Sequence, residues 1–445
     1  MKFANSIRTE PAFLICIFAP EEKMCDNKLY YLIWRIMMMR YDFETLADRR
    51  GKDAIAWDAI GTPGAPAGPK EGFDAIPMWI ADMNFVCCPA IQEAVIRRTQ
   101  HPAFGYYGIP EEYYNAVIRW HAKRNGVTGL KKEHIGYENG VLGGVVSTLN
   151  VLCSRGDKVL LQNPCYVGFT HALQSNGYEI VHNPLIRDKS GIWRMDYEDL
   201  ERKIVENRIH TTIFCSPHNP CGRVWEPEEI RRAMEIFEKH QVWVISDEIW
   251  SDILLDGHRH TPTQSVSDYA REHTAAFYAP SKTFNLAGLV GSYHIIYNDW
   301  LRDRQAKEAS LSYYNTMNVL SMHALLGAYT PDGEVWVDEL CETLSGNIRY
   351  ACDQIRNWNG VTVQQPQGTY MLFLDCREWC EKEGKEQDEL LKRGTDVGVA
   401  WQDGRMFGDP WGIRMNLALP FFKVKEAFER LNRYVFTVKD PDSMK

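Results

Sequence analysis

Four residues with chemically different side chains stand just beyond apolar segments of the chain. They are Tyr166 after VLLQNP, Asn219 after IFCSP, Asp247 after VWVIS and Lys282 after FYAPS. Short apolar runs bounded by turn-forming residues are typical of buried β-strands. Because ligands of open α/β sheets bind beyond the carboxyl ends of the strands, we expect these four side chains to line one cleft.

An aromatic ring, an amide, a carboxylate and an amine together form the set that pyridoxal 5′-phosphate requires. The lysine forms a Schiff base with the cofactor, and the aspartate keeps the pyridine nitrogen protonated so that the ring accepts electrons. The aromatic side chain stacks on the ring, and the amide donates to the 3′-oxygen. The four strand ends therefore predict a pyridoxal 5′-phosphate site.

Each residue also has a simpler explanation when it is taken alone. A single lysine such as Lys282 is usually solvated, and an aspartate such as Asp247 often caps the next helix. The segment SPHNPCG is rich in turn-forming residues. The agreement of four such residues with four strand ends favours the site over these separate explanations.

The segments between the apolar runs are long enough for helices. Pro227 suits the first helical position, and Glu228 and Glu229 suit the positive N-terminal end of a helix. Strands alternating with helices predict an α/β fold with a mainly parallel, doubly wound sheet. The predicted strands are 159–162, 211–217, 242–246, 274–281 and 292–297, and a Gly- and Pro-rich loop is predicted at 61–70.

Composition and charge narrow the class of protein. The chain has 445 residues, 45% of them hydrophobic and 24% charged, which allows two domains around a shared cleft. A net charge of −9 argues against nucleic acid or an anionic membrane as partner. The longest apolar run near the start, Phe13 to Ala19, is far shorter than the roughly 20 residues of a membrane span. Twelve cysteines without a CxxC pair indicate reduced thiols and a cytoplasmic location.

Longer motifs resemble a known family. Three motifs resemble the signature blocks of fold-type I pyridoxal-phosphate enzymes, aminotransferase class I/II. These motifs are SPHNPCG (216–222), SDEIW (246–250) and SKTFN (281–285). Four further motifs resemble one branch of this family, the MalY/PatB-type cysteine-S-conjugate β-lyases. They are IPMWIADMNF (76–85), FGYYGIP (104–110), NPCYVGF (163–169) and QGTYMLFLD (367–375). The resemblance extends from about Arg40 to Phe436.

The resemblance implies a role for each strand-end residue. Lys282 becomes the Schiff-base lysine, and Asp247 becomes the partner of the pyridine nitrogen. Asn219 becomes the donor to the 3′-oxygen, and Tyr166 becomes the stacking ring. Arg414, in IRMNLALP, is similar to the arginine that binds the substrate α-carboxylate, for which a planar guanidinium is suited. Without the family context, a surface salt bridge explains Arg414 equally well.

The phosphate of the cofactor is expected near a glycine-rich helix start. Gly140 to Gly144 precede the apolar segment VVSTLNVL, and N–H groups at a helix start attract phosphate. Leu142 and Gly143 are therefore expected to bind the phosphate through their backbone amides. Ser281 is implied as a further cofactor-binding residue, and no metal site is predicted.

The sequence departs from the aminotransferase pattern after the lysine. Aminotransferases of this class usually have an arginine there that binds the phosphate, and Val290 stands at that position. The lyase branch also lacks this arginine, and a tyrosine from the neighbouring subunit reaches the phosphate instead. Tyr106 would take that role, which implies a homodimer with shared active sites. Trp250 replaces the usual tyrosine or histidine, and Asn84 replaces the usual aspartate of ADMDF.

The resemblance also implies a division into domains. A large cofactor-binding domain is expected over residues 86–328, and a smaller α+β domain over 39–85 and 329–445. Residues 1–38, which end just before Met39, lack a clear periodicity of apolar residues. We interpret them as an extension outside the core. An extension with a function of its own is the alternative.

Three functions follow from these observations. The first is a C–S β-lyase that converts cystathionine or cysteine-S-conjugates, which are small sulfur amino acids, to thiol, pyruvate and ammonia. The second is a class I/II aminotransferase. The third is a regulator that keeps the fold and acts through protein contacts. The presence of both Lys282 and Asp247 favours an active enzyme.

The interpretation of residues 1–38 predicts that the core does not need them. A chain that starts at Met39 should match the full chain in melting temperature and in turnover, because no amphipathic period is present to dock on a domain. Thermal denaturation and initial rates of both chains test this. A melting temperature several degrees lower in the shorter chain would show that the extension packs on the core.

Overall fold

The computed structural model describes residues 39–312 and 315–436. The expected extension, residues 1–38, lies outside this range. Of the described residues, those from Tyr41 to Phe436 belong to one compact unit. In the described ranges, no helix combines the length and the hydrophobicity that crossing a bilayer takes.

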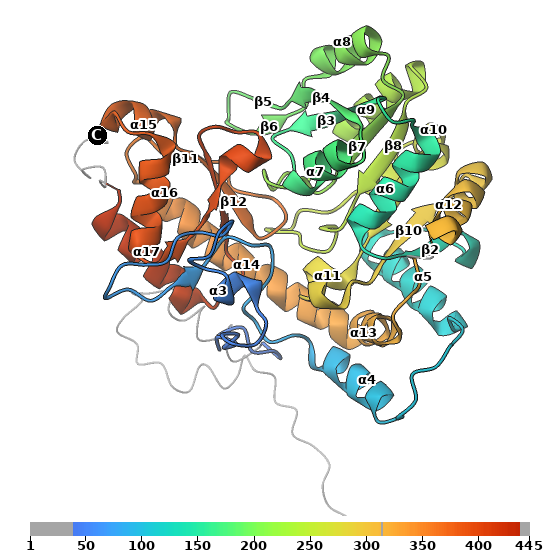
Figure 1. The fold of residues 1–445 in the computed structure, drawn as a ribbon, viewed down its shortest axis with the longest axis horizontal. Helices are drawn as coiled ribbons and strands as arrows, with labels where there is room; N and C mark the ends of the chain where they lie inside the picture. The colour runs from blue at the N-terminus through green and yellow to red at the C-terminus, as the bar shows by residue number, and fades with distance from the viewer. Residues whose placement is uncertain (1–38, 313–314, 437–445) are drawn as a thin grey trace, which may run out of the picture. The chain divides into compact units, whose positions relative to one another are not determined.

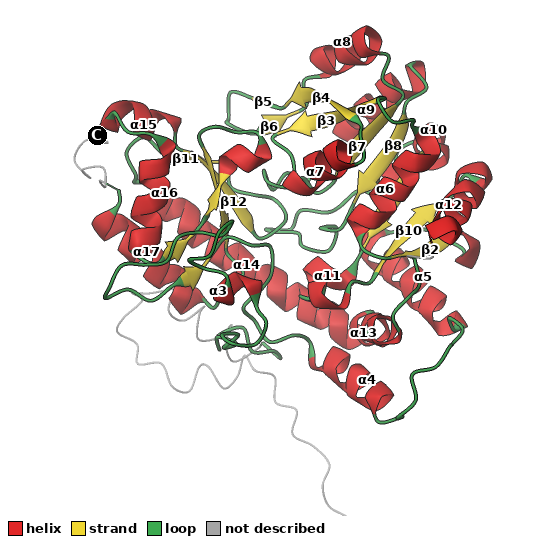
Figure 2. Ribbon diagram, in the orientation of Figure 1, coloured by secondary structure: helices red, strands yellow, loops and turns green. Residues whose placement is uncertain are grey.

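A seven-stranded sheet forms the centre of this unit (Figure 2). β10 pairs antiparallel with both of its neighbours, and every other neighbouring pair is parallel. The prediction of a mainly parallel α/β sheet is therefore confirmed. In spatial order the strands are β2 (Ile135–Glu138), β10 (Ser292–Ile296), β9 (Thr274–Tyr278), β8 (Trp243–Asp247), β7 (Thr211–Cys215), β3 (Lys158–Asn163) and β4 (Glu179–Pro184).

Helices cover both faces of the sheet, and the alternation of side chains along β3 shows why. Leu160 packs into a core with α8 (Tyr197–Asn207), α9 (Pro227–Lys239) and α10 (Asp268–Glu272). Val159 and Leu161 point to the opposite face, where they pack with α6 (Val141–Leu152), α7 (Val167–Ser175) and α12 (Asp299–Ser312). Successive side chains of a strand lie on opposite faces, so a strand that is covered on both sides is apolar throughout.

The helix start at the glycine-rich segment differs from the prediction. Helix α6 begins at Val141, so the glycines of 143 and 144 lie inside its first turns. Gly144 is required there because a Cβ would lie 2.3 Å from the Phe277 ring. The absence of a side chain thus allows α6 to lie directly on β9.

A second, four-stranded sheet is built from the C-terminal part of the chain. Its order is β11 (Thr362–Val363), β12 (Met371–Asp375), β15 (Gly412–Asn416) and β14 (Gln402–Asp403). The helices of this region are α14 (Pro331–Arg356), α15 (Arg377–Glu383), α16 (Gln387–Asp396) and α17 (Phe421–Tyr434). In Figure 1 the long helix α14 runs from beside α13 (Val319–Ala328) toward this sheet.

The N-terminal described segment pairs with the C-terminal part of the chain in a separate two-stranded sheet. β1 (Ile76–Pro77) pairs in parallel with β13 (Val399–Ala400), and the backbone of Asn84 donates to the carbonyl of Ala418. The chain then passes through α4 (Pro89–Thr99) and α5 (Glu111–Asn125) before it enters the large sheet (Figure 1). The segment 78–85 therefore lies between the two sheets, where the candidate site is found.

The short elements complete the chain. They are the helix α3 (Ile55–Asp58), the helix α11 (Pro280–Thr283) and the hairpin strands β5 (Ile186–Arg187) and β6 (Trp193–Arg194). The helix α11 belongs to the candidate site because it carries Lys282 directly after β9, and the 3₁₀-helix η3 (Ala287–Leu289) contributes Ala287 to it.

Candidate active site

A cavity of about 210 Å³ lies at the carboxyl ends of the central strands. The strand-end residues predicted to converge all line it: Tyr166, Asn219, Asp247 and Lys282. Leu142, Ser281, Val290 and Trp250 line it as well. The fold therefore gathers residues from six separate segments of the chain into one space, since Ala81 lines the cavity as well.

The amine of Lys282 is buried and held in place by a backbone carbonyl at this cavity. Its Nζ donates to the carbonyl of Ala81 at 2.9 Å. Burial, reinforced by the positive charge of Arg414, lowers the pKa of Lys282 to about 8, although Asp82 and Asp247 oppose the shift. A lysine with such a pKa is partly neutral near physiological pH, and a neutral amine can act as a nucleophile or a base.

Asp247 is the last residue of β8 and is buried. Burial raises the pKa of its carboxyl to about 7, against the opposing effect of the hydrogen bond from the Ile249 backbone N–H. That bond, 3.1 Å to Oδ1, fixes the orientation of the carboxylate. A cationic partner, such as a protonated ring nitrogen, would stabilise the ionised form of this buried carboxyl group.

Arg414 reaches the same region from β15 of the second sheet. Its Nη1 donates to Asn219 Oδ1 at 3.1 Å, and its Nη2 donates to the Trp79 carbonyl at 3.2 Å and to Gln402 Oε1. All three acceptors are neutral, and the Nε of Arg414 has no hydrogen-bond partner in the described structure. Burial lowers the pKa of Arg414 to about 10. Arg414 is thus a buried cation, and a bound carboxylate would neutralise it.

Close packing positions the ring of Tyr166. A Cβ at Gly168 would lie 2.4 Å from the Tyr166 ring, so only glycine allows the ring to lie over the start of α7. The ring also makes an edge contact with Phe169, with centroids 5.4 Å apart. Tyr166 therefore presents a constrained aromatic surface to the cavity.

The predicted phosphate-binding residues divide between two places. Gly140, Val141 and Leu142 line the cavity at the N-terminus of α6, where the helix dipole favours an anion. Gly143 lies in the same turn but lines a neighbouring depression together with Gly168.

Tyr106 does not lie in the cavity of its own chain. It belongs to the segment between α4 and α5, and its side chain is fully exposed. Phe104, two residues earlier, is also more than half exposed, at 56%. Both aromatic side chains are thus open to solvent in a single chain. The contact of Tyr106 with a neighbouring subunit stays a prediction.

Trp250 and Asn84, two residues that depart from the family pattern, are both buried and both make defined contacts. Trp250 is buried, packs edge-on against Tyr370 with centroids 4.8 Å apart, and lies 5.8 Å from the Lys282 amine. Asn84 is buried outside the cavity lining, and its Oδ1 accepts from Trp57 Nε1 at 2.7 Å. Trp250 is therefore part of the site, whereas Asn84 supports the segment that crosses it.

Sequence analysis missed three residues that shape the site. Asn285 holds Met83 by two hydrogen bonds of 2.9 Å, which fixes the segment that carries the Ala81 carbonyl. Asp82 pairs with Arg49 at 2.8 Å and contributes charge near Lys282. Gln402 holds Arg414 from β14. Asn285 belongs to the motif SKTFN and Asp82 to the motif IPMWIADMNF, so the sequence offered a signal for both. No local sequence pattern indicates Gln402.

Comparisons with known proteins agree with this geometry. The family model described as "Aminotransferase class I and II" matches residues 79–431. The chain belongs to this family. Within the family, it is 32% identical to cystathionine beta-lyase PatB of Bacillus subtilis (strain 168), over 88% of this chain and 98% of PatB.

Solved structures of family members have the same fold. Cystalysin from Treponema denticola, whose structure contains a pyridoxal 5′-phosphate cofactor, matches with a TM-score of 0.81 and 28% identity. The match covers 89% of this chain and 98% of cystalysin. The PLP-bound C–S lyase from Staphylococcus hominis matches with a TM-score of 0.79 and 28% identity, over 88% of this chain and 98% of that one.

The raised pKa of Asp247 predicts a pH-dependent stability of the cofactor-free protein. Its folded pKa of about 7 exceeds the ordinary 3.8, so the folded state holds more protons between these values. The free energy of unfolding should therefore fall as pH rises through this window. Asp247→Asn cannot titrate, and its oxygen can still accept from Ile249.

Urea denaturation of both cofactor-free proteins at about pH 5 and about pH 8 measures the difference. We expect the variant to gain stability relative to the unaltered protein by about 1–3 kcal/mol between the two pH values. An identical pH dependence in both proteins would show that Asp247 is already ionised at about pH 5.

Proposed function

We propose that this protein is a pyridoxal 5′-phosphate-dependent C–S β-lyase. Its substrates are cystathionine or cysteine-S-conjugates, and its products are a thiol, pyruvate and ammonia. The observation that carries the proposal is the buried Lys282 amine in one cavity with Asp247 and Asn219, whose Oδ1 accepts from the buried Arg414 guanidinium. Similarity to PatB and to the two solved lyases supports the same reaction.

The residues around the cavity fit the cofactor. Asp247 would hold the pyridine nitrogen, and Tyr166 would stack on the ring. The oxygen of Asn219 accepts from Arg414, which leaves its amide NH₂ to donate to the 3′-oxygen. The N-terminus of α6, with Leu142 and Gly143, would bind the phosphate, with help from Ser281. Lys282 would bind the cofactor covalently.

The bound cofactor supplies an electron-accepting ring that stabilises negative charge at the substrate Cα. Arg414 would bind the α-carboxylate with its planar guanidinium and so fix the direction of the Cα–H bond. Lys282, with its pKa of about 8, would take the proton from Cα as a general base. Loss of the β-thiolate then follows without a second substrate.

Val290 supports a composite site made by two subunits. It lines the cavity with an apolar side chain where aminotransferases of this class usually have the phosphate-binding arginine. The phosphate dianion needs other donors, and Tyr106 from a second subunit is the candidate. A homodimer in the cytoplasm is therefore part of the proposal.

The proposed domain division follows the two sheets. Residues 86–328 contain every strand of the seven-stranded sheet, and the four-stranded sheet lies wholly within 329–445. Residues 39–85 join the smaller domain through the pairing of β1 with β13. The cleft between the two domains would then hold the cofactor.

The reaction type can be measured directly. With cystathionine and without any 2-oxo acid, the purified holoenzyme should release pyruvate, ammonia and thiol in equal amounts. Lys282→Ala should lose the visible absorption of the lysine-bound cofactor and should lower turnover by orders of magnitude. Pyruvate formation coupled to lactate dehydrogenase gives the rate.

Two outcomes would contradict this assignment. If product formed only when a 2-oxo acid was added, the aminotransferase function would replace the lyase function. If Lys282→Ala kept both its absorption and its rate, Lys282 would not be the cofactor-binding residue.

The shared site predicts complementation between variants. Tyr106→Phe should raise the dissociation constant of the cofactor, because the phosphate loses one hydrogen-bond donor. After subunit exchange, a mixture of Tyr106→Phe and Lys282→Ala proteins contains one site with both an intact lysine and an intact tyrosine. We expect this mixture to exceed the summed activity of the two variants at limiting cofactor.

Subunit exchange must be confirmed independently, for example with differently tagged chains. Exchanged heterodimers without any gain in activity would place Tyr106 outside the partner's phosphate site.

A further inference from the structure

A cysteine, an aspartate and a histidine come together at the edge of the large sheet that is opposite the cofactor cavity. Cys153 directly follows α6, Asp157 directly precedes β3, and His210 directly precedes β7. Because β3 and β7 are parallel neighbours, their amino ends lie side by side (Figure 1). None of the three residues lines the cavity that contains Lys282, so the mechanism described above does not use them.

The three side chains converge on one point. The Cys153 sulfur, an Asp157 carboxylate oxygen and a His210 ring nitrogen all lie within 4.8 Å of one another. His210 Nε2 and Asp157 Oδ2 are 3.6 Å apart, which is too long for an N–H···O hydrogen bond. Two ligands bound at about 2.0–2.1 Å to one tetrahedral zinc ion lie about 3.3 Å apart. The spacing therefore fits two ligands of one ion better than it fits a direct hydrogen bond.

The ligand types favour zinc. Zn²⁺ binds thiolate, imidazole and carboxylate ligands, whereas Mg²⁺ and Ca²⁺ prefer sites made of oxygen atoms. Burial raises the pKa of the Cys153 thiol to about 11, against the opposing effect of the Thr211 hydroxyl beside it. The thiol is therefore weakly reactive by itself, which argues against a redox role. A coordinated dication removes the thiol proton outright, and the Thr211 hydroxyl can then donate to the thiolate.

The backbone around the three ligands also favours a cation. Cys153 caps the C-terminus of α6, and its N–H donates to the Leu149 carbonyl at 2.7 Å. The negative end of the helix dipole therefore lies at the first ligand. Asp157 Oδ2 accepts from the Ser154 backbone N–H at 2.6 Å, so the turn itself orients the carboxylate of the second ligand.

We propose that Cys153, Asp157 and His210 bind one Zn²⁺ ion at the amino ends of β3 and β7, with a water molecule as the fourth ligand. The ion would connect the end of α6 to two central strands, so its role is structural. No local motif indicates this site, because His210 is far from the other two ligands in the sequence. In the described part of the chain, no other set of three such side chains is arranged in this way.

Zinc binding to the purified holoenzyme measures the site directly. After treatment with a chelator, equilibrium dialysis against ZnCl₂ should give one tightly bound ion per chain. Co²⁺ in place of Zn²⁺ should produce the intense d–d bands of a tetrahedral site, at longer wavelength than the absorption of a lysine-bound cofactor. Bound Zn²⁺ should also raise the melting temperature, because the unfolded chain does not hold the three ligands together.

Variants that each remove one ligand provide the decisive comparison. Asp157→Asn keeps an oxygen that can accept from the Ser154 N–H, and His210→Gln changes a side chain that is 41% exposed, so both variants should fold. Each should raise the dissociation constant of Zn²⁺ by at least about tenfold and abolish the rise in melting temperature. Cys87→Ser and His258→Gln remove a thiol and an imidazole outside the site and should bind Zn²⁺ as the unaltered protein does.

The outcomes do not depend on the proposed lyase function, because no readout uses turnover. If the unaltered holoenzyme binds Zn²⁺ with a dissociation constant above about 10 μM, the zinc site is overturned. It is also overturned if Asp157→Asn and His210→Gln bind Zn²⁺ as tightly as the unaltered protein, or if Cys87→Ser and His258→Gln weaken binding as much as they do.

Discussion

The burial of three ionisable groups in one region is the constraint on which the rest of this structure depends: Lys282 and Asp247 line the cavity, and Arg414 forms a hydrogen bond with its lining residue Asn219. Lys282 and Arg414 are both cations, and the positive charge of Arg414 helps to lower the pKa of Lys282 to about 8. Asp247 is buried as well, and its pKa rises to about 7. Charged groups are stable in such a place only when ligands or precise hydrogen bonds compensate them. Bound groups that supply the missing charges would therefore stabilise the site.

The hydrogen bonds that hold these groups come from different parts of the chain. Lys282 donates to the Ala81 carbonyl, and Arg414 donates to the Trp79 carbonyl, so one short segment contacts both cations. Asn285 in turn fixes that segment through Met83. A shift of residues 79–83 would consequently move both cations together, which makes this segment a structural link between Lys282, the proposed Schiff-base lysine, and Arg414, the proposed carboxylate-binding residue.

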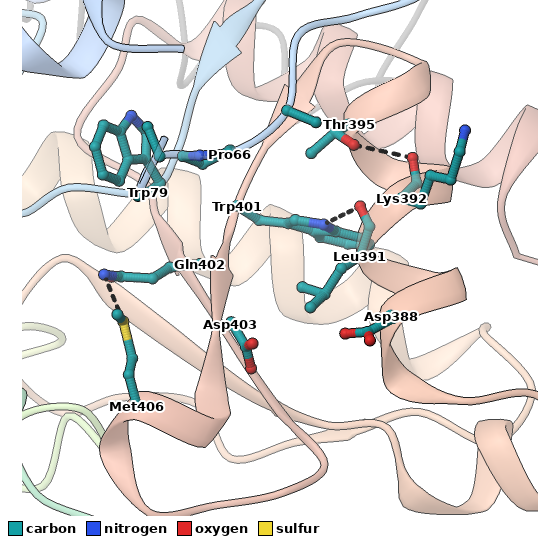
Figure 3. Close-up of a pocket in the computed structure, with 13 residues that line it drawn as sticks. Pro66, Trp79, Asp388, Leu391, Lys392, Thr395, Trp401, Gln402, Asp403 and Met406 are labelled. Atoms are coloured by element: carbon teal, nitrogen blue, oxygen red, sulfur yellow. Dashed lines mark hydrogen bonds between the residues drawn. The ribbon is translucent and has the colours of Figure 1, made fainter. Parts of the chain in front are cut away.

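The second sheet extends the same arrangement. Gln402 on β14 holds Arg414 through its Oε1 and contacts the sulfur of Met406 through its Nε2 at 3.0 Å, as the dashed line in Figure 3 marks. The orientation of the Arg414 guanidinium therefore depends on the packing of the chain around β14 as well as on the segment 79–83.

The sequence by itself determined the elements and the residues that end them. Apolar runs followed by Tyr166, Asn219, Asp247 and Lys282 are local patterns, and parallel strands necessarily bring their carboxyl ends to one edge. Tertiary structure decided the rest. Whether Arg414 is a surface ion pair or a buried cation depends on the pairing of β12, β14 and β15, which no local pattern encodes. The position of Gln402 and the start of α6 at Val141 likewise arise from contacts between segments far apart in the chain, because packing and burial are properties of the folded whole.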